Sequence, residues 1–148
     1  MSEVIDTPAL SGLEQLRAAL GGDKPTGIGK TLGFRMTELE AGRVVFEATP
    51  DEHLYNPIGT VHGGFAATLL DSATGCAVHS KLKAGQGFTT LELKVAYHRA
   101  ITKATGPVRA EGTVTSLGRR AGFAEARLTD GAGRLLASAT STLLVFDR

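Results

Sequence analysis

The sequence predicts an α+β domain in which an antiparallel β-sheet of about six strands wraps around one long buried helix. Residues 63–80 place apolar side chains around most of a helix circumference, which is typical of a helix buried on all sides. Four strand-like segments joined by short turns follow, and this order favours an antiparallel sheet. The sheet needs cover for its apolar face, and the long helix is the only segment large enough to provide it.

The other elements follow in chain order. Ser11 and Glu14 form a capping-box pattern before leucines at helical spacing, which predicts a short helix over residues 11–20. A loop containing Pro25 should follow. We therefore expect an N-terminal helix and loop in residues 1–30 and a single main domain in residues 31–148. Alternation and turn residues predict strands over residues 32–40, 43–49, 89–98, 107–116, 122–129 and 135–146.

Alternation within residues 89–98 predicts which side chains share a face of that strand. One face carries Leu91, Leu93, Val95 and Tyr97, and the other carries Thr90, Glu92, Lys94 and Ala96.

Composition limits the classes of function. The 148 residues are 42% hydrophobic and 21% charged, as expected of one folded soluble domain. The net charge is +1 and no basic cluster exceeds Arg119-Arg120, so we expect no nucleic-acid partner. No apolar stretch approaches the roughly 20 residues that span a bilayer, and the first residues do not resemble a secretory signal. We therefore expect a cytoplasmic protein without a membrane partner.

The single cysteine, Cys76, excludes an intramolecular disulfide and is expected to be a core residue. The four histidines lack the spacing of metal ligands, so no metal site is expected.

Asp71 is the only residue with a formal charge between Glu52 and Lys81, and it lies inside the apolar helix segment. Burying a lone carboxylate is costly unless it is hydrogen-bonded, and such groups concentrate where chemistry occurs. The segment begins with His62-Gly63-Gly64, so the first amide of the predicted helix, at Gly63, lies eight residues before this acid.

The stretch from Asn56 to Gly64, followed by Asp71, resembles the acyl-CoA thioesterases of the hotdog fold. It is most similar to phenylacetate-degradation thioesterases and to those 4-hydroxybenzoyl-CoA thioesterases that carry their acid nine residues after the histidine. The resemblance covers residues 32–146. It implies hydrolysis of an acyl- or aryl-CoA to free coenzyme A and a carboxylic acid, with no cofactor because coenzyme A belongs to the substrate.

The resemblance also implies roles for individual residues. Asp71 would be the general base or the nucleophile, and Gly63 would supply the N–H that holds the thioester oxygen. Asn56 would orient substrate or water, Thr90 would help to place the attacking water, and His62 is a further catalytic candidate. It implies a homo-oligomer, dimer or tetramer, whose site lies at the subunit interface, with the acid on the partner of the chain that supplies the glycine.

Two groups of residues are expected to bind the substrate. Gly64 would bind the substrate, and Leu54, Tyr55 and Phe65 would contribute to the acyl pocket. Gly118, Arg119 and Arg120 lie in a predicted hairpin, where arginines could contact the phosphates of coenzyme A.

Helix geometry independently favours a shared site. The first N–H groups of a helix lack intrahelical partners and lie at the positive end of its dipole, so an amide at Gly63 suits an oxyanion. Asp71 lies eight residues further on, roughly 12 Å at 1.5 Å per residue. One chain's Gly63 and Asp71 therefore cannot easily flank one carbonyl.

Structural roles remain open for the same residues. Asp71 could cap a neighbouring loop, His62 could hold the helix start, Gly63 and Gly64 could serve packing, and Asn56 could form an Asx turn. Two alternative functions also remain open: a non-catalytic acyl-CoA-binding protein of the same fold, or a hydratase, which would need a histidine paired with the acid.

Overall fold

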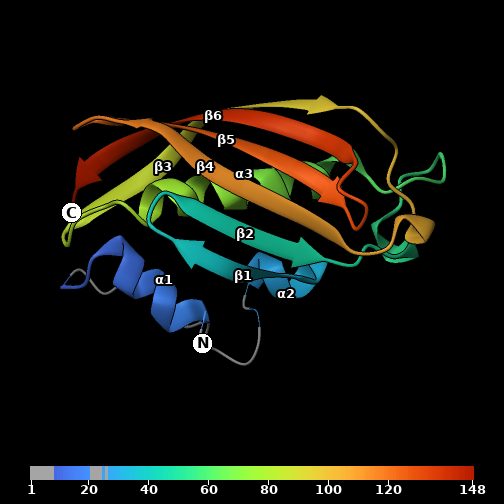
Figure 1. Cartoon of the computed structure of the whole chain (residues 1–148), viewed down its shortest axis with the longest axis horizontal. Helices are drawn as coiled ribbons and strands as arrows, with labels where there is room; N and C mark the ends of the chain where they lie inside the picture. The colour runs from blue at the N-terminus through green and yellow to red at the C-terminus, as the bar shows by residue number, and fades with distance from the viewer. Residues whose placement is uncertain (1–8, 21–24, 26) are drawn as a thin grey trace.

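Six strands form one antiparallel sheet in the order β1-β2-β4-β5-β6-β3 (Figure 1). The structure is a computed structural model and describes residues 9–20, 25 and 27–148. The strands span Phe34–Glu40 (β1), Arg43–Ala48 (β2), Gln86–Tyr97 (β3), Val108–Leu117 (β4), Ala121–Asp130 (β5) and Leu135–Asp147 (β6). The predicted sheet of about six strands is confirmed, with strand ends within two or three residues of those expected.

Helix α3, Gly63–His79, packs against five of the six strands and is the covered centre of the domain. Leu69, Leu70 and Ala73 have no exposed surface, and burying a leucine side chain contributes roughly 1.5–3 kcal/mol. Gly112 of β4 lets the sheet approach the helix closely, because a Cβ there would collide with the carbonyl of Ala73. The long buried helix predicted over residues 63–80 is confirmed.

The N-terminal helix is confirmed. The loop predicted after it lies mostly outside the described residues, since residues 21–24 and 26 are not described. Helix α1, Gly12–Leu20, begins with the expected capping box, since the Ser11 N–H donates to the Glu14 carboxylate at 2.8 Å. The loop prediction is wrong at Gly27–Leu32, which forms helix α2. The sequence did not predict this helix because two of its residues are glycines, which have a low helix propensity. Gly33 ends the helix with a φ of 72°. The division into residues 1–30 and 31–148 stays a prediction.

Strand β3 departs from simple alternation at a β-bulge. Thr90 pairs with Leu143 and Glu92 pairs with Thr142, so Leu91 is an extra residue with no partner of its own. The prediction that Leu91 shares a face with Leu93 is therefore wrong, and Leu91 is 61% exposed. The bulge reverses the alternation, so Thr90 before it and Leu93, Val95 and Tyr97 after it all point toward α3 or pack with the core.

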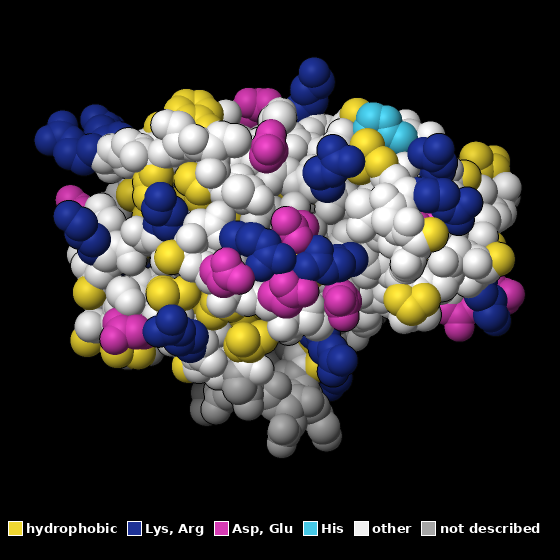
Figure 2. All heavy atoms as spheres, viewed as in Figure 1, with side chains coloured by type: hydrophobic (Ala, Val, Ile, Leu, Met, Phe, Trp, Pro, Cys, Tyr) yellow, Lys and Arg dark blue, Asp and Glu magenta, His cyan; other side chains and the backbone are white. Residues whose placement is uncertain are grey.

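The face of the sheet that points away from α3 carries a network of ion pairs (Figure 2). Arg43 and Arg109 bridge Glu38, Glu40 and Glu111 at 2.6–3.3 Å. These charges satisfy one another on the solvent side of β1, β2 and β4. Among the described residues, no helix has the length and apolar character needed to cross a membrane.

Candidate active site

The Asp71 carboxylate lies in the middle of α3, half-buried, and faces strand β3. Thr90 Oγ1 donates a hydrogen bond of 3.0 Å to Asp71 Oδ1. Within the part of the chain that the structure describes, no lysine, arginine or histidine forms an ion pair with Asp71. A half-buried carboxylate with one hydroxyl donor and no cation partner is available for chemistry at its remaining oxygen lone pairs.

The thiol of Cys76 lies on the same helix but is not a nucleophile. Burial, reinforced by the negative charge of Asp71, raises the pKa of Cys76 to about 12. A thiol with that pKa is almost entirely protonated at neutral pH, and the thiolate is the reactive form. Cys76 packs against the core, as the sequence predicted.

The start of α3 presents backbone amides at the positive end of the helix. His62 is the N-cap, and its Nδ1 accepts a hydrogen bond of 2.8 Å from the N–H of Gly64. The carbonyl of His62 accepts from the N–H of Phe65 at 3.0 Å. The N–H of Gly63 has no acceptor among the described residues. It is therefore a donor left free for an external oxygen.

His62 has the structural role that the sequence left open. Its Nδ1 is occupied by the Gly64 amide, which leaves the proton on Nε2. Gly64, predicted as a substrate-binding residue, is held in this cap. Asp71 lies on the same helix at eight residues from Gly63, roughly 12 Å away. Because α3 begins at Gly63, the helix start that the distance argument assumes is confirmed. A site shared between protomers stays a prediction.

Asn56 organises the loop that leads to α3. Its Oδ1 accepts hydrogen bonds from the N–H groups of Ile58 and Thr60 at 3.1 and 3.2 Å, and its Nδ2 donates to Thr60 Oγ1 at 3.0 Å. The Asx turn suggested by the sequence is therefore present. One amide hydrogen of Asn56 stays uncommitted in these bonds, and its role toward substrate stays a prediction.

The residues predicted for the acyl pocket are mostly covered within the protomer. Leu54 and Phe65 are 8% and 4% exposed and belong to the main core cluster. The Tyr55 hydroxyl accepts a hydrogen bond of 2.8 Å from the N–H of Lys103. The contact of these side chains with substrate stays a prediction.

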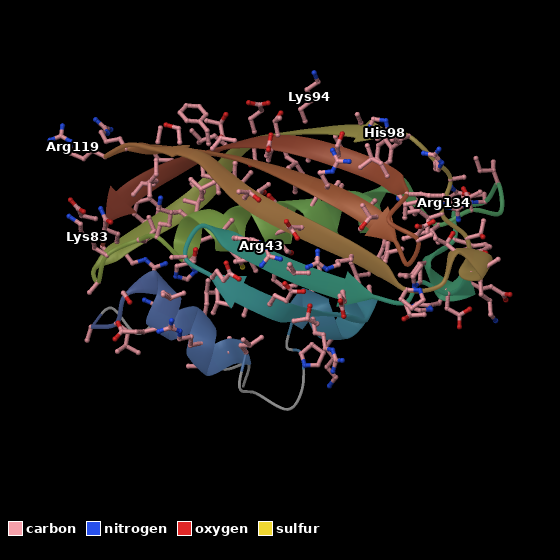
Figure 3. All side chains as sticks on the ribbon, in the orientation of Figure 1. Arg43, Lys83, Lys94, His98, Arg119 and Arg134 are labelled. Carbon is pink, nitrogen blue, oxygen red and sulfur yellow. The ribbon has the colours of Figure 1, made fainter. Side chains whose placement is uncertain are left out.

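Gly118, Arg119 and Arg120 lie in the predicted hairpin between β4 and β5, and all three are exposed. Figure 3 shows Arg119 and His98 at opposite ends of the sheet. Gly122, just after the hairpin, contacts Val78 near the end of α3, roughly 22 Å along the helix from Gly63. The hairpin arginines and the Gly63 amide therefore do not meet within one protomer.

Tyr97 is one residue near the site that strand periodicity did not single out. Its hydroxyl donates a hydrogen bond of 2.8 Å to the carbonyl of Gly63. Alternation grouped it with Leu93 and Val95 on one face of β3, but nothing in the spacing indicated that it reaches the helix start.

Comparison with known proteins identifies the class of fold and then the family. A phenylacetic acid degradation-related protein from Ralstonia eutropha JMP134 has a crystal structure that matches with a TM-score of 0.75 and 27% identity, covering 84% of this chain and 95% of that one. One long helix covered by one antiparallel sheet is the hotdog fold that the sequence predicted. Residues 58–137 match the thioesterase superfamily model, and the chain belongs to that family.

Two curated relatives support the same assignment. The proofreading thioesterase EntH of Klebsiella pneumoniae is 32% identical over 79% of this chain and 84% of its own length. The 1,4-dihydroxy-2-naphthoyl-CoA hydrolase of Listeria monocytogenes is 26% identical over 80% of this chain and 95% of its own length. The chain is accordingly an enzyme of the thioester hydrolase class.

Proposed function

We propose that the protein is a homo-oligomeric acyl-CoA thioesterase that releases coenzyme A and a carboxylic acid. One observation carries the proposal: a half-buried Asp71, oriented by Thr90, lies on the same buried helix that begins with an unpartnered Gly63 amide. The named activities of the curated relatives, a thioesterase and a CoA-ester hydrolase, support the same chemistry.

The two groups would act on opposite sides of the planar thioester. The carbonyl oxygen would accept the Gly63 N–H and gain negative charge as the tetrahedral intermediate forms, and one such donor is typically worth about 3–4 kcal/mol. Asp71 would either remove a proton from the attacking water or attack the carbonyl carbon itself. In both cases the C–S bond breaks, the sulfur leaves and is protonated to the thiol, and water supplies the acid oxygen.

The separation of about 12 Å favours an arrangement in which the two groups come from different protomers. Strand β3 supports this arrangement, because it is the last strand of the sheet and its outer edge has no partner strand among the described residues. Its exposed Leu91 and Tyr97, at 61% and 56%, are apolar groups that a second protomer would cover. Pairing of two β3 edges would set two α3 helices side by side in opposite directions, with one helix start beside the middle of the other.

The same arrangement gives the hairpin arginines a role. Arg119 and Arg120 lie at the opposite end from their own Gly63, and an oppositely directed partner would bring its hairpin toward that end. There they would meet the phosphates of coenzyme A, which guanidinium groups bind in bidentate fashion. We propose the cytoplasm as the location, since acyl-CoA esters are made there and the lone cysteine needs no oxidising compartment.

A hydratase is not favoured by the geometry. His79, on the same helix as Asp71, approaches Gln15 Oε1 at 3.3 Å and packs on the ring of Phe88 at 5.3 Å. His62 caps the helix start. Neither histidine is paired with Asp71 in the bonds that the structure records.

Thiol release from a panel of acetyl-, hexanoyl-, palmitoyl-, benzoyl- and phenylacetyl-CoA tests the proposal. Asp71→Asn should lower kcat about a thousandfold while leaving the fold and coenzyme A binding intact. Asp147→Asn, a change of the same kind at an exposed position near the C-terminus, is the matched control and should keep the wild-type rate. Coenzyme A binding without thiol release by the wild type would establish the non-catalytic alternative, and wild-type turnover by Asp71→Asn would refute the assigned role.

A further inference from the structure

We propose that Tyr97 is a positioning residue that sets the direction of the Gly63 N–H toward the thioester oxygen. The inference rests on the proposed function and adds a residue that the roles assigned above do not include. It starts from a single peptide group, the one joining Gly63 to Gly64.

This peptide group is held at both ends by side chains. The Tyr97 hydroxyl donates to its carbonyl oxygen at 2.8 Å, and its N–H donates to His62 Nδ1 at 2.8 Å. Because a peptide group is planar, fixing its oxygen and its nitrogen fixes the orientation of the whole plane. The plane on the other side of Gly63 is held as well, since the His62 carbonyl accepts from Phe65 at 3.0 Å.

The backbone of a glycine needs external restraint more than that of any other residue. Without a Cβ, Gly63 can adopt many combinations of φ and ψ, so its amide direction is poorly defined by its own sterics. Two fixed planes on either side leave little freedom for the N–H. An oxyanion donor acts fully only when it already points at the developing charge.

The ring of Tyr97 also closes one side of Gly63. A Cβ built on Gly63 would lie 3.0 Å from both Cζ and Oη of Tyr97, so the phenol fills the space that a side chain would occupy. This contact gives a physical reason for glycine at position 63.

The hydrogen-bonding needs of the Gly63 carbonyl do not by themselves explain why the Tyr97 hydroxyl binds it. The carbonyl of a first-turn helical residue already accepts the regular bond from four residues further on, so it does not need a second donor. Tyr97 is 56% exposed, so its ring is not held there by burial within the protomer. The hydroxyl adds a restraint on the orientation of the peptide plane that joins Gly63 to Gly64.

Steady-state kinetics of Tyr97→Phe on the best substrate of the panel test the inference. The ring and its packing remain, and only the bond to the Gly63 carbonyl is lost. We expect kcat to fall between about tenfold and a hundredfold with KM changed less than about threefold, because misplacement of a catalytic group affects the transition state most. Rates are expressed per coenzyme A-binding site, so that a loss of folded protein does not lower the measured kcat. Thr115→Val, which removes another exposed hydroxyl bonded to a backbone carbonyl at 2.9 Å, should leave kcat unchanged.

Two unreactive ligands distinguish a misdirected Gly63 N–H from a general loss of affinity at the site. Acetonyl-CoA carries a carbonyl oxygen, and propyl-CoA has the same length without it. The wild type should bind acetonyl-CoA more tightly than propyl-CoA, and Tyr97→Phe should lose most of that preference while binding propyl-CoA normally. An unchanged kcat, an equal loss of affinity for both ligands, or no preference in the wild type would overturn the role of Tyr97. Absence of wild-type hydrolysis would instead overturn the proposed function.

Discussion

Thr90 Oγ1 lies 3.0 Å from Asp71 Oδ1 although strand alternation assigns Thr90 to the face opposite Leu93 and Val95. The β-bulge at Leu91 resolves this difference, because one extra residue shifts the phase of the strand and turns Thr90 inward. The bulge thus places a hydroxyl on the Asp71 carboxylate while Leu93 and Val95 still pack against the core.

Removing the Thr90 hydroxyl should therefore reduce turnover without unfolding the protein. Thr90→Val keeps the shape of the side chain and loses the donor to Asp71, and we expect kcat to fall about tenfold, the equivalent of roughly 1.4 kcal/mol. Thr90→Ser should retain most of the activity, since it keeps the hydroxyl. Steady-state thiol release measures both, with the exposed neighbour Thr89→Val as the control. Equal rates for Thr90→Val and the wild type would show that the bond has no catalytic effect.

The N–H of Gly63 can be removed with little damage to the helix. Gly63 is the first residue of α3, a position that accepts proline, and His62 before it has φ −59° and ψ 135°, which suit a residue preceding proline. We expect Gly63→Pro to lower kcat by about a hundredfold to a thousandfold, because the oxyanion donor is gone.

Gly63→Ala is the matched variant, since it adds a Cβ against Tyr97 but keeps the N–H. It should lose less activity than the proline variant, because it keeps the N–H that the proline variant removes. Circular dichroism and thermal unfolding check that both variants remain folded. If alanine and proline reduce kcat equally, the loss comes from the Cβ and the N–H is not the donor.

A site shared between protomers predicts complementation. Asp71→Asn and Gly63→Pro chains, co-expressed with two different affinity tags and purified through both, would form dimers in which one site has both changes and the other has neither. Each such dimer should show about half the wild-type activity, although each parent is nearly inactive. Light scattering gives the oligomeric state of the same sample. Activity no higher than that of the parents would place both groups in one protomer's site.

The hydrogen bonds of Asp130 predict that the protein loses part of its stability in acid. The backbone N–H of Arg134 at 2.9 Å, helped by the Arg134 guanidinium and the Ala132 N–H, holds the pKa of Asp130 below its usual range. A carboxyl whose pKa is lowered by folding stabilises the protein above its unfolded pKa, near 4, and loses that contribution as pH falls through the folded value.

Asp130→Asn should therefore lower Tm at pH 7 and show a smaller fall in Tm between pH 5 and pH 2 than the wild type. Thermal unfolding followed by circular dichroism across this range measures the difference. Asp147→Asn should follow the wild-type curve, and a curve for Asp130→Asn parallel to the wild type would contradict the assigned pKa direction.

The sequence by itself determined the class of fold, the long buried helix and the positions of Asp71 and Gly63 on it. These follow from local rules: the hydrophobic period of residues 63–80, the cap at His62 and the single charge within an apolar segment. Helix α2 was missed because its two glycines give no local signal for a helix.

Only the tertiary structure decided which side chains meet the helix. The bulge that turns Thr90 inward depends on pairing with a strand some fifty residues later in the chain, and the bond from Tyr97 to Gly63 joins residues far apart in sequence. Alternation describes one strand in isolation, whereas register and reach depend on the neighbour against which that strand is packed.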